Sequence, residues 1–139
     1  MVSILDEIIE YMKEYEFSVP IKDVRETYSP KSPVYPMVTV EETRNSPDLQ
    51  LHGELIRSKL NYRFEIYGRD TSIGDTVLTK RQVVRKIGND IDTIMRTKYG
   101  MKCISSPQIL PYTTDNSVLR YIITYTGVID TRTMIIYQK

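Results

Sequence analysis

A strand followed by a long amphipathic helix constrains the fold of this 139-residue chain more than any other feature. Residues 60–67 alternate apolar and polar side chains, as a half-buried strand does. Residues 79–99 carry an apolar seam at helical spacing, formed by Val84, Ile87, Ile91, Ile94 and Met95. Thr79 can cap the start of this helix, and Gly100 suits the left-handed position after its end. Gly88 lies in mid-helix, where we expect a neighbouring backbone to approach closely.

The remaining segments predict one α+β domain over residues 1–139, with two helices packed on a small, mainly antiparallel sheet. Ser3 is the expected N-cap of the first helix. Prolines at 20, 30, 33 and 36 make residues 18–36 a connector or an extended arm, and they confine any strand there to a sheet edge. The predicted order is helix, strand, strand, helix and three strands, at 4–15, 36–42, 60–67, 79–99, 101–110, 117–129 and 133–137.

Two polar segments between these elements are predicted to be long loops. Residues 43–59 are too many for a tight hairpin turn, and residues 68–76 contain two glycines. Loops of such length in a small domain are usually functional or disordered. They are therefore the first places to look for contacts with a partner, although a mobile surface is the plainer interpretation.

Composition excludes several classes of protein. A net charge of +1 argues against a general nucleic-acid binder, which carries a clear basic excess. Cys103 is the single cysteine and cannot form an internal disulfide, which favours a reducing compartment. The acidic, amphipathic start of the chain is not a signal peptide, and no apolar run approaches the roughly 20 residues that a membrane helix needs.

No motif in the sequence is strong evidence for a catalytic or metal-binding site. Pro47-Asp48 followed by Glu65 on a strand is similar to the carboxylates of a metal-dependent nuclease, but Tyr67 stands where such a site has lysine. Cys103 and His52 could form a nucleophile and base only if the fold brought them together. Neither a phosphate loop nor enough ligands for a tetrahedral zinc site is present in the sequence. We therefore assign no catalytic, cofactor-binding or metal-binding residue.

From residue 36 onward, the order of the segments resembles a known family. The stretches that carry the likeness are 36–45, 62–67, 87–103 and 115–130, with Met101 at a position where the family often has an aromatic residue. The family is that of the tail terminator proteins of long-tailed bacteriophages, also called tail completion or tail-to-head joining proteins and often labelled minor capsid proteins. No single segment is diagnostic, so the weight lies in the order and spacing.

The resemblance implies a structural virion protein and not an enzyme. Its subunits would form a homo-oligomeric ring, expected to be a hexamer, that caps the head-proximal end of the tail tube and ends its polymerisation. The partners implied are the tail tube protein and the connector or stopper protein of the head, with DNA passing through the lumen and no membrane involved. The subunit would reside in the host cytoplasm during assembly and then in the neck of the virion. A head-side neck adaptor is the alternative, and a small nuclease is a more distant one.

Eight residues are candidates for the interfaces. We expect Arg44, Asn45, Asp48 and His52 to contact the tube or a neighbouring subunit, and Arg69 and Asp70 to do so from the second loop. Glu42 and Arg120 lie in stretches that resemble the family, and we expect an ion pair between them within or between subunits. A solvated surface position is the alternative for each of the eight.

Overall fold

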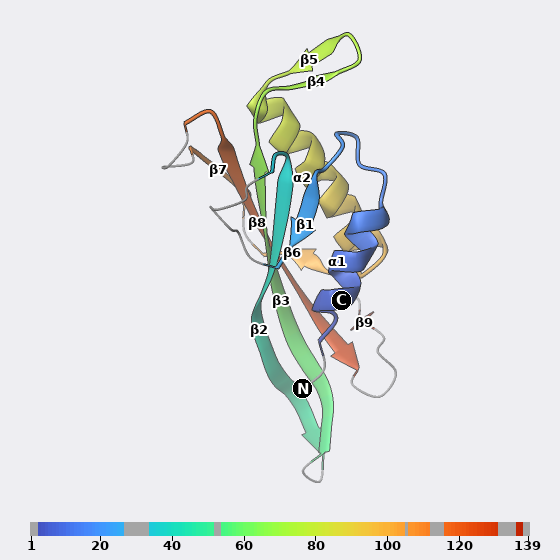
Figure 1. Ribbon diagram of the computed structural model, residues 1–139. Coiled ribbons are helices and arrows are strands. Elements are labelled where there is room, and N and C mark those ends of the chain that lie inside the picture. Colours follow the sequence, from blue (N-terminus) through green and yellow to red (C-terminus); the bar gives the residue numbers. More distant parts are fainter. Residues whose placement is uncertain are drawn as a thin grey trace.

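Two helices lie on one face of a mixed, mostly antiparallel sheet in the computed structural model of the protein (Figure 1). The structure describes residues 3–26, 34–51, 54–104, 106–111, 116–130 and 136–137. The predicted α+β class is confirmed. The elements in chain order are α1 (Leu5–Glu14), β1 (Asp23–Arg25), β2 (Met37–Leu51), β3 (Glu54–Gly68), β4 (Thr71–Ile73), β5 (Thr76–Leu78), α2 (Lys80–Thr97), β6 (Lys102–Cys103), β7 (Gln108–Pro111), β8 (Leu119–Asp130) and β9 (Ile136–Tyr137).

The long strands β2, β3 and β8 form the centre of the sheet, in that order. Edge strand β1 pairs in parallel with residues 37–39 of β2, as the prolines around it led us to expect for an edge. Along the other side of β8 lie the short strands β7, β6 and β9, one after another. Strands β4 and β5 form a separate two-stranded hairpin between β3 and α2.

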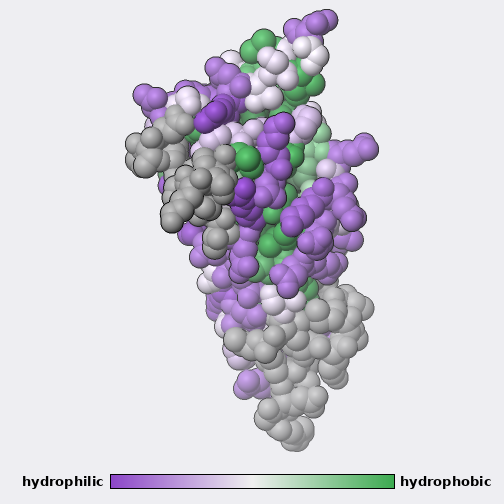
Figure 2. All heavy atoms as spheres, in the orientation of Figure 1, coloured by the Kyte–Doolittle hydropathy of each residue, from purple (hydrophilic) through white to green (hydrophobic). Residues whose placement is uncertain are grey.

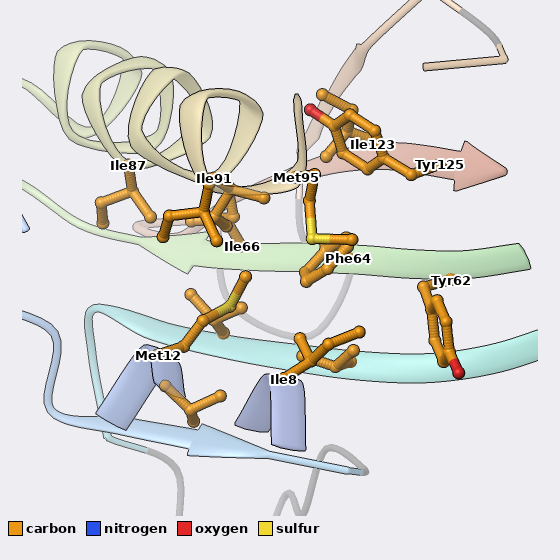
Figure 3. Packing of buried hydrophobic residues seen from close by; sticks show 14 of the residues in the cluster. Ile8, Met12, Tyr62, Phe64, Ile66, Ile87, Ile91, Met95, Ile123 and Tyr125 are labelled. Atoms are coloured by element: carbon orange, nitrogen blue, oxygen red, sulfur yellow. The ribbon is translucent and has the colours of Figure 1, made fainter. Parts of the chain in front are cut away.

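The core lies between the helices and one face of the sheet. Alternate residues of β3, which include Tyr62, Phe64 and Ile66, are fully buried there, as the alternation predicted. Figure 3 shows how side chains of α1, α2 and β8 meet them, among them Met12 and Ile91. The opposite face holds a smaller cluster of Met37, Tyr67, Val118 and Tyr35.

Helix α2 begins and ends as predicted. Thr79 and Gln82 form a reciprocal capping box, and Gly100 has a φ of 62°. The prediction for Gly88 was wrong in one respect, because the group that approaches it is the ring of Tyr121 and not a backbone. The N-cap of α1 is Ile4 and not Ser3 as predicted, although Ser3 Oγ accepts a hydrogen bond from the backbone N–H of Leu5, the first residue of the helix, at 3.2 Å.

Both predicted loops contain strands. Residues 43–59 are not a loop: β2 and β3 pair as one long hairpin whose register runs from Met37 opposite Tyr67 to Leu51 opposite Glu54. Register shifts after Glu42 and around residues 47–50 interrupt the two-residue alternation, so the sequence pattern hides the strands. The shorter segment, 68–76, contributes β4 and the turn into β5.

Candidate functional site

The helix-free end of the three central strands is the most distinctive surface of the molecule. We call it the strand arm and define it as residues 44–51 of β2, 54–61 of β3 and 126–130 of β8. It starts just past Tyr62, whose hydroxyl accepts a hydrogen bond from the backbone N–H of Ile4 at 3.2 Å. Figure 1 shows these strands running on past both helices, while the β4–β5 hairpin lies at the opposite end.

Three of the predicted interface residues lie together on the strand arm. Arg44, Asn45 and Asp48 are on β2, and Arg44 Nε donates to Ser46 Oγ at 3.0 Å. Asp48 Oδ2 lies 3.5 Å from Arg57 Nε on β3. The structure thus places these residues on a paired strand and not in the predicted loop, and their role in an interface stays a prediction. His52 falls outside the described residues.

The two residues expected to form an ion pair lie on opposite faces of the sheet. Glu42 Oε1 faces the helices, where it accepts hydrogen bonds from the Tyr62 hydroxyl at 2.7 Å and from Ser3 Oγ at 2.8 Å. Arg120 is on the other face, with Nη1 3.6 Å from Glu65 Oε1. A Glu42–Arg120 pair within one chain is therefore wrong, because β3 separates the two positions. A pair between subunits stays a prediction.

The hydrogen-bonded cluster of Ser3, Glu42 and Tyr62 also affects the ionisation of Tyr62. Burial raises the pKa of Tyr62 above that of a free tyrosine, and the hydrogen bond to Glu42 raises it further, since an ionised Tyr62 would face a carboxylate. The cluster joins the start of α1 to β2 and β3. Glu42 is thus occupied within the fold, and sequence reasoning missed this role because its partners Ser3 and Tyr62 are distant in the chain.

Arg69 and Asp70 also have partners within the chain. The Arg69 guanidinium lies 4.4 Å from the centre of the Tyr35 ring. Asp70 Oδ1 accepts a hydrogen bond from the backbone N–H of Lys80 at 2.7 Å, which holds the β4–β5 hairpin to the start of α2. These contacts give both residues a structural role. Any further role toward a partner stays a prediction.

An aromatic row beside α1 was missed by the sequence reasoning. The rings of Tyr11, Tyr15 and Phe17 follow one another, with centroids 6.1 and 4.9 Å apart. Beside them a groove of about 500 Å³ lies between the end of α1 and β1, and its lining includes Tyr15, Phe17, Pro20 and Ile21. The signal in the sequence was the spacing of the aromatic residues, four and then two residues apart.

The surface has a second, smaller apolar feature at the end opposite the strand arm. Figure 2 shows hydrophobic atoms at the β4–β5 end of the molecule, where Val77 is 67% exposed. Ile73 and Leu78 of the same hairpin are partly buried and pack against the core. Val77 therefore leaves apolar surface exposed at the β4–β5 end of the subunit.

The structure does not assemble the nuclease-like pair. Asp48 lies beside Arg57, while Glu65 is opposite Thr39, eight residues farther along β3. At about 3.3 Å per residue, the two carboxylates are about 26 Å apart and cannot share one metal ion. In the part of the chain that the structure describes, no three acidic, histidine or cysteine side chains are grouped as metal ligands. Cys103 is half-buried on β6, and its pairing with His52 stays untested.

Comparisons with protein-family models and with curated proteins found no match for this chain. Neither described helix is long and apolar enough to cross a membrane. The resemblance to the tail terminators therefore stays a prediction that depends on the order of the segments quoted above.

Proposed function

We propose that this protein is a structural subunit of a phage virion that assembles into a ring at the head-proximal end of the tail tube, ends tube polymerisation and joins the tail to the head. The observation that carries the proposal is the presence of two projections at opposite ends of one body (Figure 1). A subunit that joins two different structures needs two different ends. The strand arm and the β4–β5 hairpin provide them.

The strand arm is suited to contact with another protein. Its described part of β2 is eight residues long, which corresponds to about 26 Å. Leu60 and Ile129 at its base are buried in the main core, but no described helix lies along the part that runs past both helices (Figure 1). Such an arm gains stability when a partner covers one of its faces, and Arg44, Asn45 and Asp48 would then lie at that contact.

The sheet edges favour contacts between side chains over the pairing of strands between subunits. Among the described residues, no strand pairs with the outer side of β2 beyond Thr39. This free edge is interrupted by register shifts and by Pro47, and both features discourage pairing with another strand. The opposite edge consists of strands of two to four residues, β6, β7 and β9. We therefore expect the ring to close through side-chain surfaces, with two different patches meeting at each interface.

Charge balance is compatible with a passage for DNA. The chain carries a net charge of +1, so a ring of such subunits has little general affinity for phosphates. On the face away from the helices, Arg63 pairs with Glu41, and Arg120 lies near Glu65. A lumen lined continuously by lysine and arginine in an assembled ring would contradict this part of the proposal.

The test is assembly with a polymerised tail tube. Purified protein should form rings with a central hole under negative-stain microscopy, and it should bind one end of the tubes and stop their growth. Asp48→Lys on the strand arm should abolish capping, whereas Asp75→Lys in the turn of the β4–β5 hairpin is the matched control for tube binding. The reverse result would mean that the β4–β5 end faces the tube. A protein that stays monomeric and leaves tube growth unchanged would refute the proposal.

The same experiment separates a terminator from a neck adaptor. An adaptor would bind the portal or connector of the head in preference to tube ends. Equal amounts of protein should therefore be offered to tubes and to connectors, and the bound fractions compared. Preference for connectors would replace the terminator assignment with the adaptor.

A further inference from the structure

We propose that neighbouring copies of this chain meet through an acidic side of α1 and a basic side of α2. The acidic side carries Asp6, Glu10 and Glu14, and the basic side carries Arg81 and Arg85. The inference rests on the ring proposed above and names the two different patches that join one subunit to the next. A second copy of this chain is the partner because each patch is the complement of the other.

The acidic side of α1 is a row of carboxylates at helical spacing. Asp6, Glu10 and Glu14 follow one another four residues apart, so they lie on one side of the helix, and all three are exposed. At 1.5 Å per residue the row is about 12 Å long. Lys13 is the single basic residue of α1, and its Nζ lies 3.7 Å from Glu10 Oε1. Within the described part of the chain neither Asp6 nor Glu14 forms an ion pair, so the row keeps a net negative charge.

The basic side of α2 has the same four-residue spacing. Arg81 and Arg85 are exposed near the start of the helix, on neighbouring turns. Among the described residues, none forms a hydrogen bond or an ion pair with either guanidinium. The two acids of this helix, Asp90 and Asp92, have hydrogen-bond partners elsewhere. Arg81 and Arg85 therefore form a positive patch that the fold itself does not neutralise.

The two patches belong to opposite sides of the subunit. Helix α1 packs over β1 and β2 at one side of the sheet, and α2 packs over β3 and β8 toward the other (Figure 1). Gly88 and Asp92 come three and seven residues after Arg85, which places all three on one side of α2. Gly88 lies against Tyr121 of β8, and Asp92 accepts a hydrogen bond from Tyr125 of the same strand. Arg85 therefore faces the β8 side of the molecule.

Contact within one chain does not join the two patches. The backbone N–H of Ser18, in the connection after α1, donates to Asp90 at 2.7 Å. At 3.6 residues per turn, Asp90 is turned about 140° from Arg85 around the helix, so α1 and its connection lie on the other side of α2. The helices themselves meet where Tyr11 contacts Tyr99, beyond the far end of α2 from Arg85. The partner of each patch must therefore come from another copy.

This arrangement suits a closed ring. Subunits placed side by side in one orientation bring the β1 side of one copy against the β8 side of the next, so the acidic row meets the arginines at every contact. The equal spacing of the two patches lets two acids align with two arginines. Because exposed ion pairs are individually weak, the charges mainly select the partner and its orientation.

The test is an exchange of charge between the two patches. One variant carries Glu10→Lys and Glu14→Lys, and the other carries Arg81→Glu and Arg85→Glu. Each alone should weaken self-association about ten-fold or more, measured by sedimentation velocity over a dilution series, because like charges then face each other. An equal mixture of the two variants should associate as the wild type does, since every contact between different variants pairs opposite charges.

Controls separate a lost contact from a lost fold. Glu14→Lys places a base in the last turn of α1 and Arg81→Glu an acid in the first turn of α2, so both changes favour their own helix. Circular dichroism should accordingly show both variants folded. Lys86→Glu is the matched control, because Lys86 is the exposed neighbour of Arg85 but is turned about 100° from it around the helix. This variant should associate as the wild type does.

The same variants decide between a second copy and other occupants. If Arg81→Glu with Arg85→Glu abolishes binding to duplex DNA but leaves self-association unchanged, nucleic acid is the ligand of the basic side and the inference is overturned. If each variant loses association and the mixture does not regain it, the two patches do not meet each other, which also overturns the inference.

Further outcomes separate this inference from the proposed function. If wild-type rings form and charge reversal on either side leaves them unchanged, the inference fails while the ring proposal stands. If mixing restores association but the assembled wild type leaves tube growth unchanged, the inference stands and the terminator proposal fails. A wild-type chain that is monomeric at every concentration would overturn both.

Discussion

Replacing Gly88 with alanine tests the packing of α2 on β8. A Cβ atom at this position would lie 2.8 Å from Cε1 and 3.1 Å from Cζ of Tyr121. Carbon atoms do not approach so closely, so either the ring or the helix must shift. Tyr121 is only 9% exposed and its ring is rigid, which limits how far it can move.

Two opposing effects decide the result. Alanine in mid-helix is favoured over glycine by about 1 kcal/mol. Overpacking a well-filled core costs about 1–3 kcal/mol. We therefore expect Gly88→Ala to lower the free energy of unfolding by about 1 kcal/mol, despite the better helix propensity of alanine.

The assay is urea unfolding followed by circular dichroism, at one fixed protomer concentration because assembly would shift the midpoint. Asn89→Ala, at the exposed neighbouring position, is the control and should raise stability by a few tenths of a kcal/mol. In a Tyr121→Leu background the close contact is absent, and Gly88→Ala should then be stabilising by about 1 kcal/mol. A stabilising effect of similar size in the wild-type background would refute the close packing.

Two further predictions concern the attachment of α2 and the buried tyrosines. Thr79→Ala removes the Oγ1 that accepts the backbone N–H of Gln82 at 3.3 Å, and it should lower the free energy of unfolding in urea by about 1 kcal/mol. Tyr125→Phe removes the 2.7 Å hydrogen bond to Asp92 and should cost about 1.5 kcal/mol at pH 7. Burial, and then this hydrogen bond, raises the pKa of Tyr125 above its ordinary value of 10.0. Its contribution is therefore complete below pH 10 and is lost as the pH rises toward the higher folded-state pKa. Unfolding midpoints between pH 8 and 11 should fall less steeply for Tyr125→Phe than for the wild type, and parallel curves would contradict this.

The fold could be predicted wherever one face of an element is buried. The seam of α2 and the alternation of β3 each follow from contact with a single core, so their periods are visible in the sequence. The strand arm could not be predicted in this way. It mixes polar residues with apolar ones such as Leu60 and Ile129, which are buried in the core, and the shifts after Glu42 and around Pro47 change which face each residue occupies. A stretch of this kind looks like a loop even when every residue is paired.

The candidate site was harder to predict than the fold, for the same reason. We expected an ion pair between Glu42 and Arg120 because both lie in stretches that resemble the family. Their side chains lie on opposite faces of the sheet, and these faces depend on a register that only the paired strands define. Asp70 looked like a free loop residue, yet its carboxylate holds the first N–H of α2. The residues that remain for recognition are those on the strand arm and on the exposed sides of the two helices, where the side chains are not all used by the fold. An interface between copies of this chain should be sought there, because the charged residues Glu42, Arg120 and Asp70 already have partners within the chain.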